Sequence, residues 1–594
     1  MLHTFHIPVL GLAYSVDTPV KVAHLGISSV TSIVDDFLLE RLRKFYTEKE
    51  GWEYHPVSVK EAGYRSKRVT AYLNTLLRIV RQKTEALKKE SFSQKGNLTR
   101  YYELLPETSS LKGLYLQYTQ MPEGETKRRL EQELKDRVTA GTIDVNIMSK
   151  VDKMNYTATG EEGGSDALEA LKGFAESDLE SSVVLSAGMN PRLYSYLENF
   201  ADFYPDTQQR LRKKIILKVS DFRSALIQAK FLAKKGLWVS EFRIESGLNC
   251  GGHAFATEGY LLGPILEEFK NKRQEMIGEL FQLYGKALET RQIICAEPPK
   301  MRISVQGGIG TAEENAFLLN YYEMDATGWG SPFLLVPEAT TVDADTLQAL
   351  TRAVPEDFYI SNASPLGIPF NNFRPSTSEK QRLERIAKNR PGSPCTKKFL
   401  VSNTEFTEEA ICTASRQYQS LKIKQLKQEE KDPGELQKKI DAVTEKDCLC
   451  EGLATSAYLA YDLLKPRENS AVAICPGPNL AYFSGSFSLE EMVKHIYGKL
   501  NLLADIPRPN IFINELKLYV DYLRKDVETS FQDLKKAKYL QKFRDQLQNG
   551  IQYYKELIPA IYNQTEAYRK KMMDDLLELE KQVVAFQLQL QPAT

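Results

Sequence analysis

Short apolar segments alternate with amphipathic segments over the first 350 residues of the chain. The apolar segments, such as ISSVTSIV at 27–34 and KKIILKVSD at 213–221, are rich in β-branched side chains. This composition is typical of buried strands. The segments between them repeat hydrophobic residues at three- and four-residue spacing, which predicts helices with one apolar face. About seven or eight such pairs predict an α/β fold, a (β/α)₈ TIM barrel, with a doubly wound open sheet as the alternative.

The same pattern divides the chain into four parts. Residues 37–140 are charged and periodic at helical spacing, and they interrupt the barrel pattern of residues 1–36 and 141–350 as a helical insertion. Residues 351–505 are less regular and contain five of the seven cysteines. Residues 506–594 predict a helical C-terminal region of long packed helices, a candidate surface for a homodimer or a protein partner.

Composition narrows the classes of function. The 78 Lys and Arg residues balance 78 Asp and Glu residues, so the net charge gives no sign of nucleic-acid binding. No apolar run reaches the ~18 residues of a membrane span, and the first residues lack the pattern of a secretory signal. Seven cysteines, an odd number in a long chain, favour a reduced cytoplasmic protein.

Two predicted strands late in the barrel end in glycine-rich loops. SVQGGIGT contains Gly307 and Gly308, and ATGWGSPF contains Gly330 followed by Ser331. Glycines let the backbone approach an anion so that N–H groups face it, and a following helix adds the positive end of its dipole. In a barrel the loops after the last two strands build a phosphate site. The alternative is a pair of tight structural turns.

A third loop, GLNCGGHAF at 247–255, comes directly after the predicted strand WVSEFRIES. Gly251 and Gly252 would allow a flat ring to approach the backbone, and His253 could reach a substrate above that ring. Zinc is a poor interpretation, because one Cys and one His do not supply four ligands. A packed turn with a buried histidine is the structural alternative.

Taken together, several segments resemble a known family. IPVLGLAYSVDTP, SAGMNP, ESGLNCGGHAF, VQGGIGTAEENAFLL and ATGWGSPFLLVPEA, in this order, look like the nitronate monooxygenase family and the related FMN-dependent enoyl-acyl-carrier-protein reductases. These families are flavin TIM barrels. The resemblance covers the start of the chain and roughly residues 141–340. It leaves out the insertion and most of the chain after residue 375.

The resemblance, which also includes VNIM around Asn146 and LKVSDFRSALIQAKFLAKKG from Leu217, implies roles in FMN binding for residues in several of these segments. The phosphate would be held by backbone N–H groups of Gly307, Gly308, Gly330 and Ser331. Residues expected around the flavin ring or its ribityl chain are Gly11, Leu12, Ala13, Asn146, Lys218, Gly251 and Gly252. His253 matches the histidine that lies beside the flavin where substrate binds. The chain departs from the family in lacking a Pro-Met step after the first strand and in having Cys250 before the two glycines.

The cysteines after the barrel suggest a second cofactor. An iron–sulfur cluster or another metal is one hypothesis, since a Cys-Pro step occurs at some cluster ligands and FMN can pass single electrons to a cluster. Buried free cysteines are the alternative, because no CxxC pair is present. The residues concerned are Cys395, Cys412, Cys448, Cys450 and Cys475.

The sequence therefore predicts an FMN-dependent oxidoreductase, a monooxygenase or a reductase, acting on a small organic or acyl substrate. His253 would be the catalytic acid–base or would orient the substrate. Two alternatives remain open at this point. One is a non-redox barrel enzyme that binds a phosphorylated substrate through the same glycine loops. The other is a flavin-binding component of a larger assembly.

Overall fold

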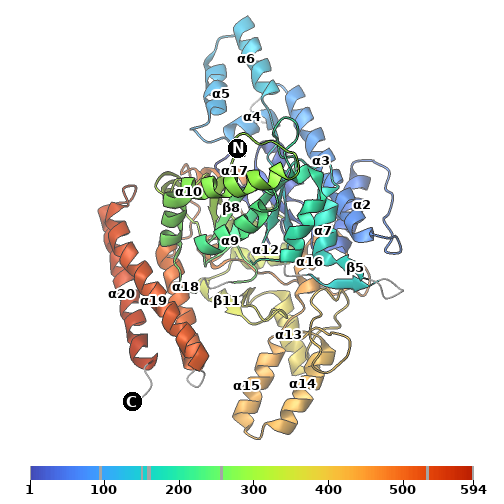
Figure 1. Cartoon of the computed structure of the whole chain (residues 1–594), viewed down its shortest axis with the longest axis vertical. Coiled ribbons are helices and arrows are strands. Elements are labelled where there is room, and N and C mark those ends of the chain that lie inside the picture. Colours follow the sequence, from blue (N-terminus) through green and yellow to red (C-terminus); the bar gives the residue numbers. More distant parts are fainter. Residues whose placement is uncertain are drawn as a thin grey trace.

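The computed structural model describes residues 2–92, 96–148, 152–156, 162–186, 188–254, 258–529 and 534–590. Eight parallel strands form a closed barrel, in the order β1, β10, β9, β8, β7, β6, β3 and β2 around its circumference (Figure 1). The strands are β1 (Phe5–Ile7), β2 (Ser28–Ser32), β3 (Ile143–Ile147), β6 (Ser182–Leu185), β7 (Lys214–Val219), β8 (Val239–Glu245), β9 (Arg302–Gln306) and β10 (Ala326–Gly328). This closure confirms the predicted (β/α)₈ barrel and excludes the open sheet.

The first strand is shorter than its apolar sequence suggests. IPVLGL predicts a strand to Leu12, whereas β1 ends at Ile7 and a series of turns comes after it. Pro8 has no N–H for the next ladder bond, and Gly11 adopts a left-handed conformation with φ of 51°. The Oγ of Ser15 accepts a hydrogen bond from the N–H of Leu10, which holds the turn over the barrel mouth.

Inward-facing positions of the strands form layers inside the barrel. Near the amino ends of the strands the layer is charged, with Arg243 paired to Glu241 at 2.9 Å and to Asp144 at 3.4 Å. Val30, Val184 and Ile216 form an apolar cluster that is separate from the main core. Side chains alternate across a strand, so the next inward-facing residue after Asp144 on β3 is Asn146, and the next after Ile216 on β7 is Lys218. The last inward residue of each strand therefore faces the barrel mouth.

Helices surround the barrel. The covering helices include α1 (Thr18–Val22), α7 (Asp166–Ala175), α8 (Pro191–Tyr196), α9 (Phe222–Ala233), α10 (Leu262–Glu289), α11 (Ala312–Asn320) and α12 (Ala344–Thr351). Between β3 and α7 lies a small antiparallel hairpin of β4 (Met154–Tyr156) and β5 (Glu162–Ser165). No helix among the described residues is long and apolar enough to cross a lipid bilayer.

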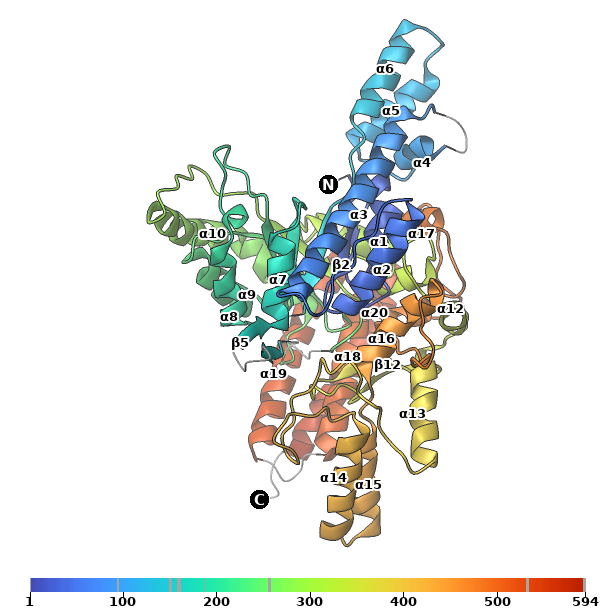
Figure 2. The same cartoon turned by 90° about the vertical axis from the view of Figure 1, so that its right-hand side faces the viewer.

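Between β2 and β3 the described residues form five helices. They are α2 (Asp36–Lys49), α3 (Tyr64–Lys89), α4 (Asn97–Glu103), α5 (Ser110–Gln120) and α6 (Glu125–Asp136). Helices α5 and α6 project away from the barrel (Figures 1 and 2). The chain from 93 to 95 inside the predicted insertion lies outside the described residues.

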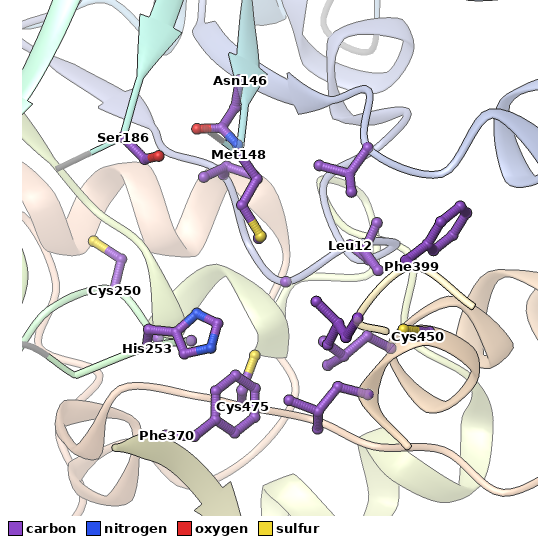
Figure 3. A pocket seen from close by; sticks show the side chains of 18 of the residues that line it. Leu12, Asn146, Met148, Ser186, Cys250, His253, Phe370, Phe399, Cys450 and Cys475 are labelled. Carbon is purple, nitrogen blue, oxygen red and sulfur yellow. The ribbon is translucent and has the colours of Figure 1, made fainter. Parts of the chain in front are cut away.

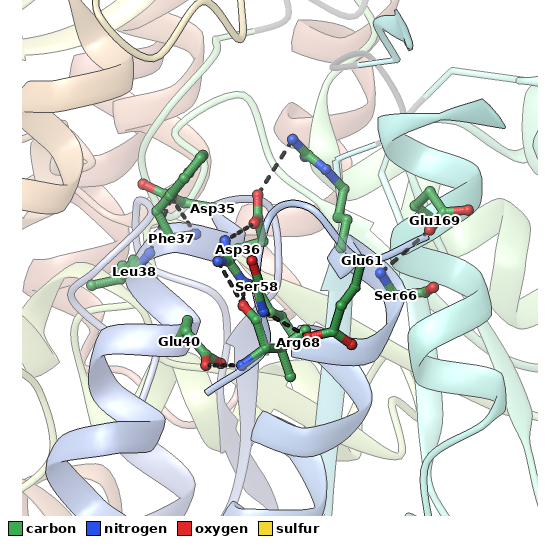
Figure 4. Close-up of polar contacts among 12 residues, drawn as sticks. Asp35, Asp36, Phe37, Leu38, Glu40, Ser58, Glu61, Ser66, Arg68 and Glu169 are labelled. Carbon is green, nitrogen blue, oxygen red and sulfur yellow. Dashed lines mark hydrogen bonds and ion pairs between the residues drawn. The ribbon is translucent and has the colours of Figure 1, made fainter. Parts of the chain in front are cut away.

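Buried ion pairs join this helical part to the barrel, and Figure 4 shows the contacts of Asp36 within it. Asp36 on α2 is bound by Arg68 at 2.8 Å and by Arg65 at 3.3 Å, and both arginines lie on α3. Arg65 also reaches Asp166 on α7 at 3.3 Å. A Cβ added at Gly173 of α7 would lie 2.6 Å from the carbonyl oxygen of Ser66, so glycine permits the close helix contact.

After β10 the chain continues over the carboxyl ends of the strands. It forms the hairpin β11 (Phe358–Ser361) and β12 (Phe370–Phe373), followed by α13 (Thr377–Ala387), α14 (Arg416–Glu429), α15 (Pro433–Thr444), α16 (Leu449–Ala460) and α17 (Leu489–Ile496). Helices α14 and α15 project at the end of the molecule opposite to α5 and α6 (Figure 2).

The C-terminal region consists of three long helices, α18 (Ile511–Thr529), α19 (Leu534–Leu557) and α20 (Glu566–Leu590). They pack on one another, and α18 and α19 also pack on α10 of the barrel (red and orange in Figure 1). The predicted helical region thus has its own intramolecular contact surface. A role in a homodimer or with a protein partner stays a prediction.

Candidate functional site

A cavity opens at the carboxyl ends of the barrel strands (Figure 3). It contains about 1080 Å³ of empty space, including its open mouth. Residues at the strand ends form one side, namely Val9, Gly11, Leu12, Val34, Asn146, Met148, Ser186, Lys218 and Glu245. The loop from Cys250 to His253 and the segments after the barrel form the other side, with Phe370, Phe399, Leu400, Leu449, Cys450, Leu453 and Cys475. The cavity is of the size and largely apolar character of an organic-ligand site.

Polar groups gather on the barrel side of the cavity. The Nζ of Lys218 lies 2.7 Å from Glu245 Oε2, and Gln306 Nε2 donates to Glu245 Oε1 at 2.8 Å. The three residues lie at or next to the carboxyl ends of the neighbouring strands β7, β8 and β9, so the strand register brings them together. The cavity therefore offers one ion pair and the side chains of Asn146 and Ser186 to a ligand whose remaining surface meets apolar groups.

The loop that carries Gly251 and Gly252 packs against segments that are distant in the chain. Gly251 forms an isolated β-bridge with Pro476, and the N–H of Gly252 donates to the carbonyl oxygen of Cys475 at 3.0 Å. Gly251 has a φ of 120°, and a Cβ there would lie 2.2 Å from that same oxygen. At Gly252 an added Cβ would meet nothing within 4 Å. The backbone at Gly252 thus leaves open space beside it, whereas Gly251 is required by packing.

His253 lines the cavity, with its ring held between a hydroxyl and an aromatic side chain. Its Nε2 lies 2.7 Å from Ser364 Oγ, and its ring meets Phe370 edge-on with centroids 5.2 Å apart. Ser364 is fully buried and its Oγ also accepts a hydrogen bond from the N–H of Leu366. The Ser364 hydroxyl therefore lies within hydrogen-bonding distance of His253 and fixes the position of its Nε2 atom.

The two late glycine loops lie beside the cavity and do not line it. A Cβ added at Gly308 would lie 2.4 Å from Leu248 Cδ1, and one at Gly330 would lie 2.8 Å from Cys250 Sγ. Ser331 Oγ donates to the carbonyl oxygen of Cys250 and accepts from the N–H of Gly477 at 2.7 Å. Burial raises the pKa of the Cys250 thiol, which keeps it neutral. These loops are therefore packed against the chain itself, with Cys250 between them.

Some features of these loops nevertheless fit an anion. No described group accepts a hydrogen bond from the backbone N–H groups of Gly308, Ile309, Gly330 or Ser331, although all four residues are buried. Buried N–H groups in proteins almost always have an acceptor. The donors therefore suit a phosphate group, while the side chain of Cys250 narrows the space in which such a group would lie.

The structure brings together part of the predicted site. Gly11, Leu12, Asn146, Lys218, Gly251, Gly252 and His253 all line the cavity. Ala13, Gly307, Gly308, Gly330 and Ser331 do not. Ala13 is buried within the turns after β1, and Phe255 at the end of the GGH segment lies outside the described residues.

Sequence reasoning missed several lining residues. Glu245 and Ser186 could have been found from alternation, since each continues the inward-facing positions of its strand. The apolar wall from the segments after the barrel carries no such signal, because its residues come from irregular segments, from the first residue of β12 and from α16.

The predicted metal or iron–sulfur site is not supported. Within the described part of the chain, which includes all seven cysteines, no group of three or more His, Cys, Asp or Glu side chains could hold a metal ion. Cys475 lines the cavity near Gly11, Cys448 and Cys450 lie at the start of α16, and Cys395 lies beside Cys412. All seven thiols are free.

Comparison with known proteins adds little. No protein-family model and no curated protein sequence matches the chain. Among solved structures, FabK from Thermotoga maritima is similar at a TM-score of 0.30 and 12% identity, covering 71% of this chain and 92% of that one. The enoyl reductase domain of MlnA, from the macrolactin biosynthesis cluster of Bacillus amyloliquefaciens, gives a TM-score of 0.31 and 14% identity over 72% and 87% of the two chains. The barrel assignment rests on the strand order alone.

Proposed function

We propose that the chain is an FMN-dependent oxidoreductase that acts on a small, largely apolar organic or acyl substrate. The observation that carries this proposal is the cavity at the carboxyl ends of the barrel strands, where active sites of such barrels are built. Its apolar walls, one ion pair and the open space beside Gly252 suit a flat ring with a substrate next to it.

Different residues of the cavity would have different roles. The turn at Gly11 and Leu12 and the backbone of Gly252 would bound the ring, and Asn146, Ser186 and Lys218 would donate hydrogen bonds to its polar edge. His253, fixed by Ser364, would hold or move a proton beside the substrate. Phe399, Leu400 and Leu453 would exclude water. When bound, FMN supplies hydride or electron transfer, which protein side chains do not provide.

The phosphate end is the less open part of the proposed site. The N–H groups of Gly308, Ile309, Gly330 and Ser331 are the donors available for it. Close backbone approach at glycines and unpaired N–H groups are the usual means of holding a phosphate without basic side chains. The Cys250 side chain would have to turn aside to let the phosphate reach all of them.

The test is direct identification of a bound flavin. The purified protein should show the visible absorbance of an oxidised flavin, and the molecule released by acid should have the mass of FMN. If the purified protein is colourless, titration with FMN should quench flavin fluorescence at one site per chain. Binding of riboflavin but not FMN would place the ring in the cavity and reject the phosphate site. Failure of both to bind would refute the proposal.

A further inference from the structure

We propose that Cys395 and Cys412 form a redox-active dithiol that closes to a disulfide by exchange with a small-molecule disulfide. This site lies in the segment after the barrel and is independent of the proposed flavin chemistry. Two isolated β-bridges, Ser393 with Ser415 and Asn403 with Ile411, join the segments of the two cysteines. The thiols lie close enough for each to shift the pKa of the other, although 16 positions separate them in the chain.

Backbone hydrogen bonds on both sides hold the two cysteine segments together. The N–H of Ser393 donates to the carbonyl oxygen of Ala414 at 3.0 Å, and the N–H of Arg416 donates to that of Ser393 at 2.9 Å. Farther on, Asn403 and Ile411 exchange two hydrogen bonds of 3.1 and 2.8 Å. Cys395 and Cys412 therefore lie between two sets of backbone contacts, and these contacts hold the two cysteine segments close together.

A glycine permits this approach. Gly392 has a φ of 82°, and a Cβ there would lie 2.7 Å from the backbone nitrogen of Arg416. Cys395 itself has a φ of 58°, which a non-glycine residue adopts at some energetic cost. The chain thus accepts an unfavourable backbone conformation at the residue whose thiol meets Cys412.

The two thiols differ in reactivity. Cys395 is partly exposed, and the hydrogen bond from Cys412, together with the N–H and charge of Lys398, lowers the pKa of its thiol to about 7 against the opposing effect of burial. Cys412 is buried, and its hydrogen bond to Cys395 and its burial raise its pKa. Cys395 is therefore the nucleophile, since only the thiolate attacks a disulfide, and Cys412 is the resolving thiol.

The exchange balances in two steps. The Cys395 thiolate attacks one sulfur of a small-molecule disulfide, forming a mixed disulfide and releasing one thiolate of the reagent. The Cys412 thiol then loses its proton and attacks the Cys395 sulfur, which forms the Cys395–Cys412 disulfide and releases the second half of the reagent as a thiol. The dithiol loses two electrons and two protons, and the small disulfide is reduced to two thiols.

Formation of the disulfide would also affect the cavity wall, because Cys395 lies in the segment that forms part of that wall. Phe399 and Leu400, which form part of the apolar cavity wall, come shortly after Cys395 in the same segment. Lys397 in between forms an ion pair with Asp35 at the N-terminus of α2. A disulfide at Cys395 would fix one end of this segment, and its reduction would release it.

The experiment uses the full-length reduced protein and oxidised glutathione as the probe. Peptide mapping after oxidation should recover one cross-linked species that joins the Cys395 and Cys412 peptides. Cys412→Ser should stop the reaction at glutathione attached to Cys395, and Cys395→Ser should abolish the cross-link. Cys295→Ser is the matched control, because Cys295 is also partly exposed but has a pKa raised by burial, and it should leave the cross-link unchanged.

Alkylation provides a second measurement that does not need the variants to fold identically. At pH 7 Cys395 of the unmodified protein should react with iodoacetamide about tenfold or more faster than Cys295, because it has the larger thiolate fraction. Equal rates at the two cysteines would overturn the proposal. So would a cross-link that joins Cys395 to Cys450 or Cys448 instead of Cys412.

Discussion

The carboxylate of Glu515 accepts a hydrogen bond of 2.6 Å from the backbone N–H of Gly247. Its other oxygen accepts from the N–H of Leu262 at 2.7 Å. One side chain on α18 thus binds both ends of the loop from 247 to 262, which carries His253. Gly247 also packs closely on α18, since a Cβ there would lie 2.4 Å from Tyr519 Oη. The C-terminal helices therefore take part in shaping the cavity, although they do not line it.

Replacing Glu515 by glutamine should loosen this loop. The amide keeps one acceptor oxygen but turns an NH₂ group toward the second backbone N–H, which leaves buried donors without a partner. We expect a loss of about 1–3 kcal/mol in the free energy of unfolding and faster deuterium exchange in peptides from 247 to 262. Asp521→Asn, an exposed position on the same helix, is the control. Unchanged exchange in Glu515→Gln would show that the carboxylate does not hold the loop.

Glu515 also predicts a dependence of stability on pH. Burial raises the pKa of this carboxyl from 4.5 to about 7, against the effect of the two N–H donors. The folded state therefore binds more protons than the unfolded state between these values. The contribution of Glu515 is fully present below pH 4.5 and is lost as the pH rises through about 7. Urea unfolding at several pH values should show this decline in the unmodified protein.

The comparison with Glu515→Gln isolates that contribution from other titrating groups. His3 and His24 have a pKa lowered by burial to about 4, so they destabilise the folded state as the pH falls below 6.5. Both proteins share these histidines, and burial together with the charge of Glu515 raises the pKa of the nearby Tyr554 phenol well above its usual value, outside this pH range. The difference between the two curves should fall between pH 4.5 and 7, and a flat difference would contradict the assignment.

A third prediction concerns His253. His253→Ala should retain bound FMN but slow its reduction or reoxidation by substrate by roughly 10²-fold or more, the usual scale of acid–base catalysis. His55→Ala is the control, because His55 is exposed and distant in the chain. If His253 only fills space, the variant should lose stability and keep its flavin chemistry.

Ser364 should act through His253. Ser364→Ala removes the hydroxyl that fixes Nε2, so it should alter the pH profile of kcat while leaving FMN affinity unchanged. Ser364→Thr keeps a hydroxyl and should restore the profile. A loss of affinity with an unchanged profile would instead assign Ser364 to packing of the hairpin.

Cys250 should control access to the late glycine loops. Cys250→Ala removes the thiol that lies against Gly330 and the backbone of Gly307, so FMN should bind more tightly, by about tenfold, or about 1.4 kcal/mol. Riboflavin, which lacks the phosphate, should show no gain. Substitution of Gly308 by valine is a poor test, because its Cβ would strike Leu248 whether or not a phosphate binds. Equal gains for both ligands would mean that Cys250 limits the ring and not the phosphate.

The sequence was sufficient for the barrel because strands and helices leave local periodic signals. It was insufficient for the glycine loops, since glycine is required both for close contact with a ligand and for close contact with the chain. Gly252 faces open space while Gly330 faces Cys250, and nothing in the local sequence separates the two cases. The same holds for the cysteines: their number suggested a cluster, whereas their positions depend on how distant segments cross.

The two walls of the cavity come from opposite parts of the chain, with Leu12 on one and Leu453 on the other. During synthesis all eight strands emerge long before the residues that cover their mouth, so the barrel can close while its binding site does not yet exist. The covering segment could also open without unfolding the barrel, since local opening costs less than global unfolding. The measured ligand affinity would then include the free energy of opening the covering segment. Substitutions far from any ligand atom could change this free energy and so change the affinity.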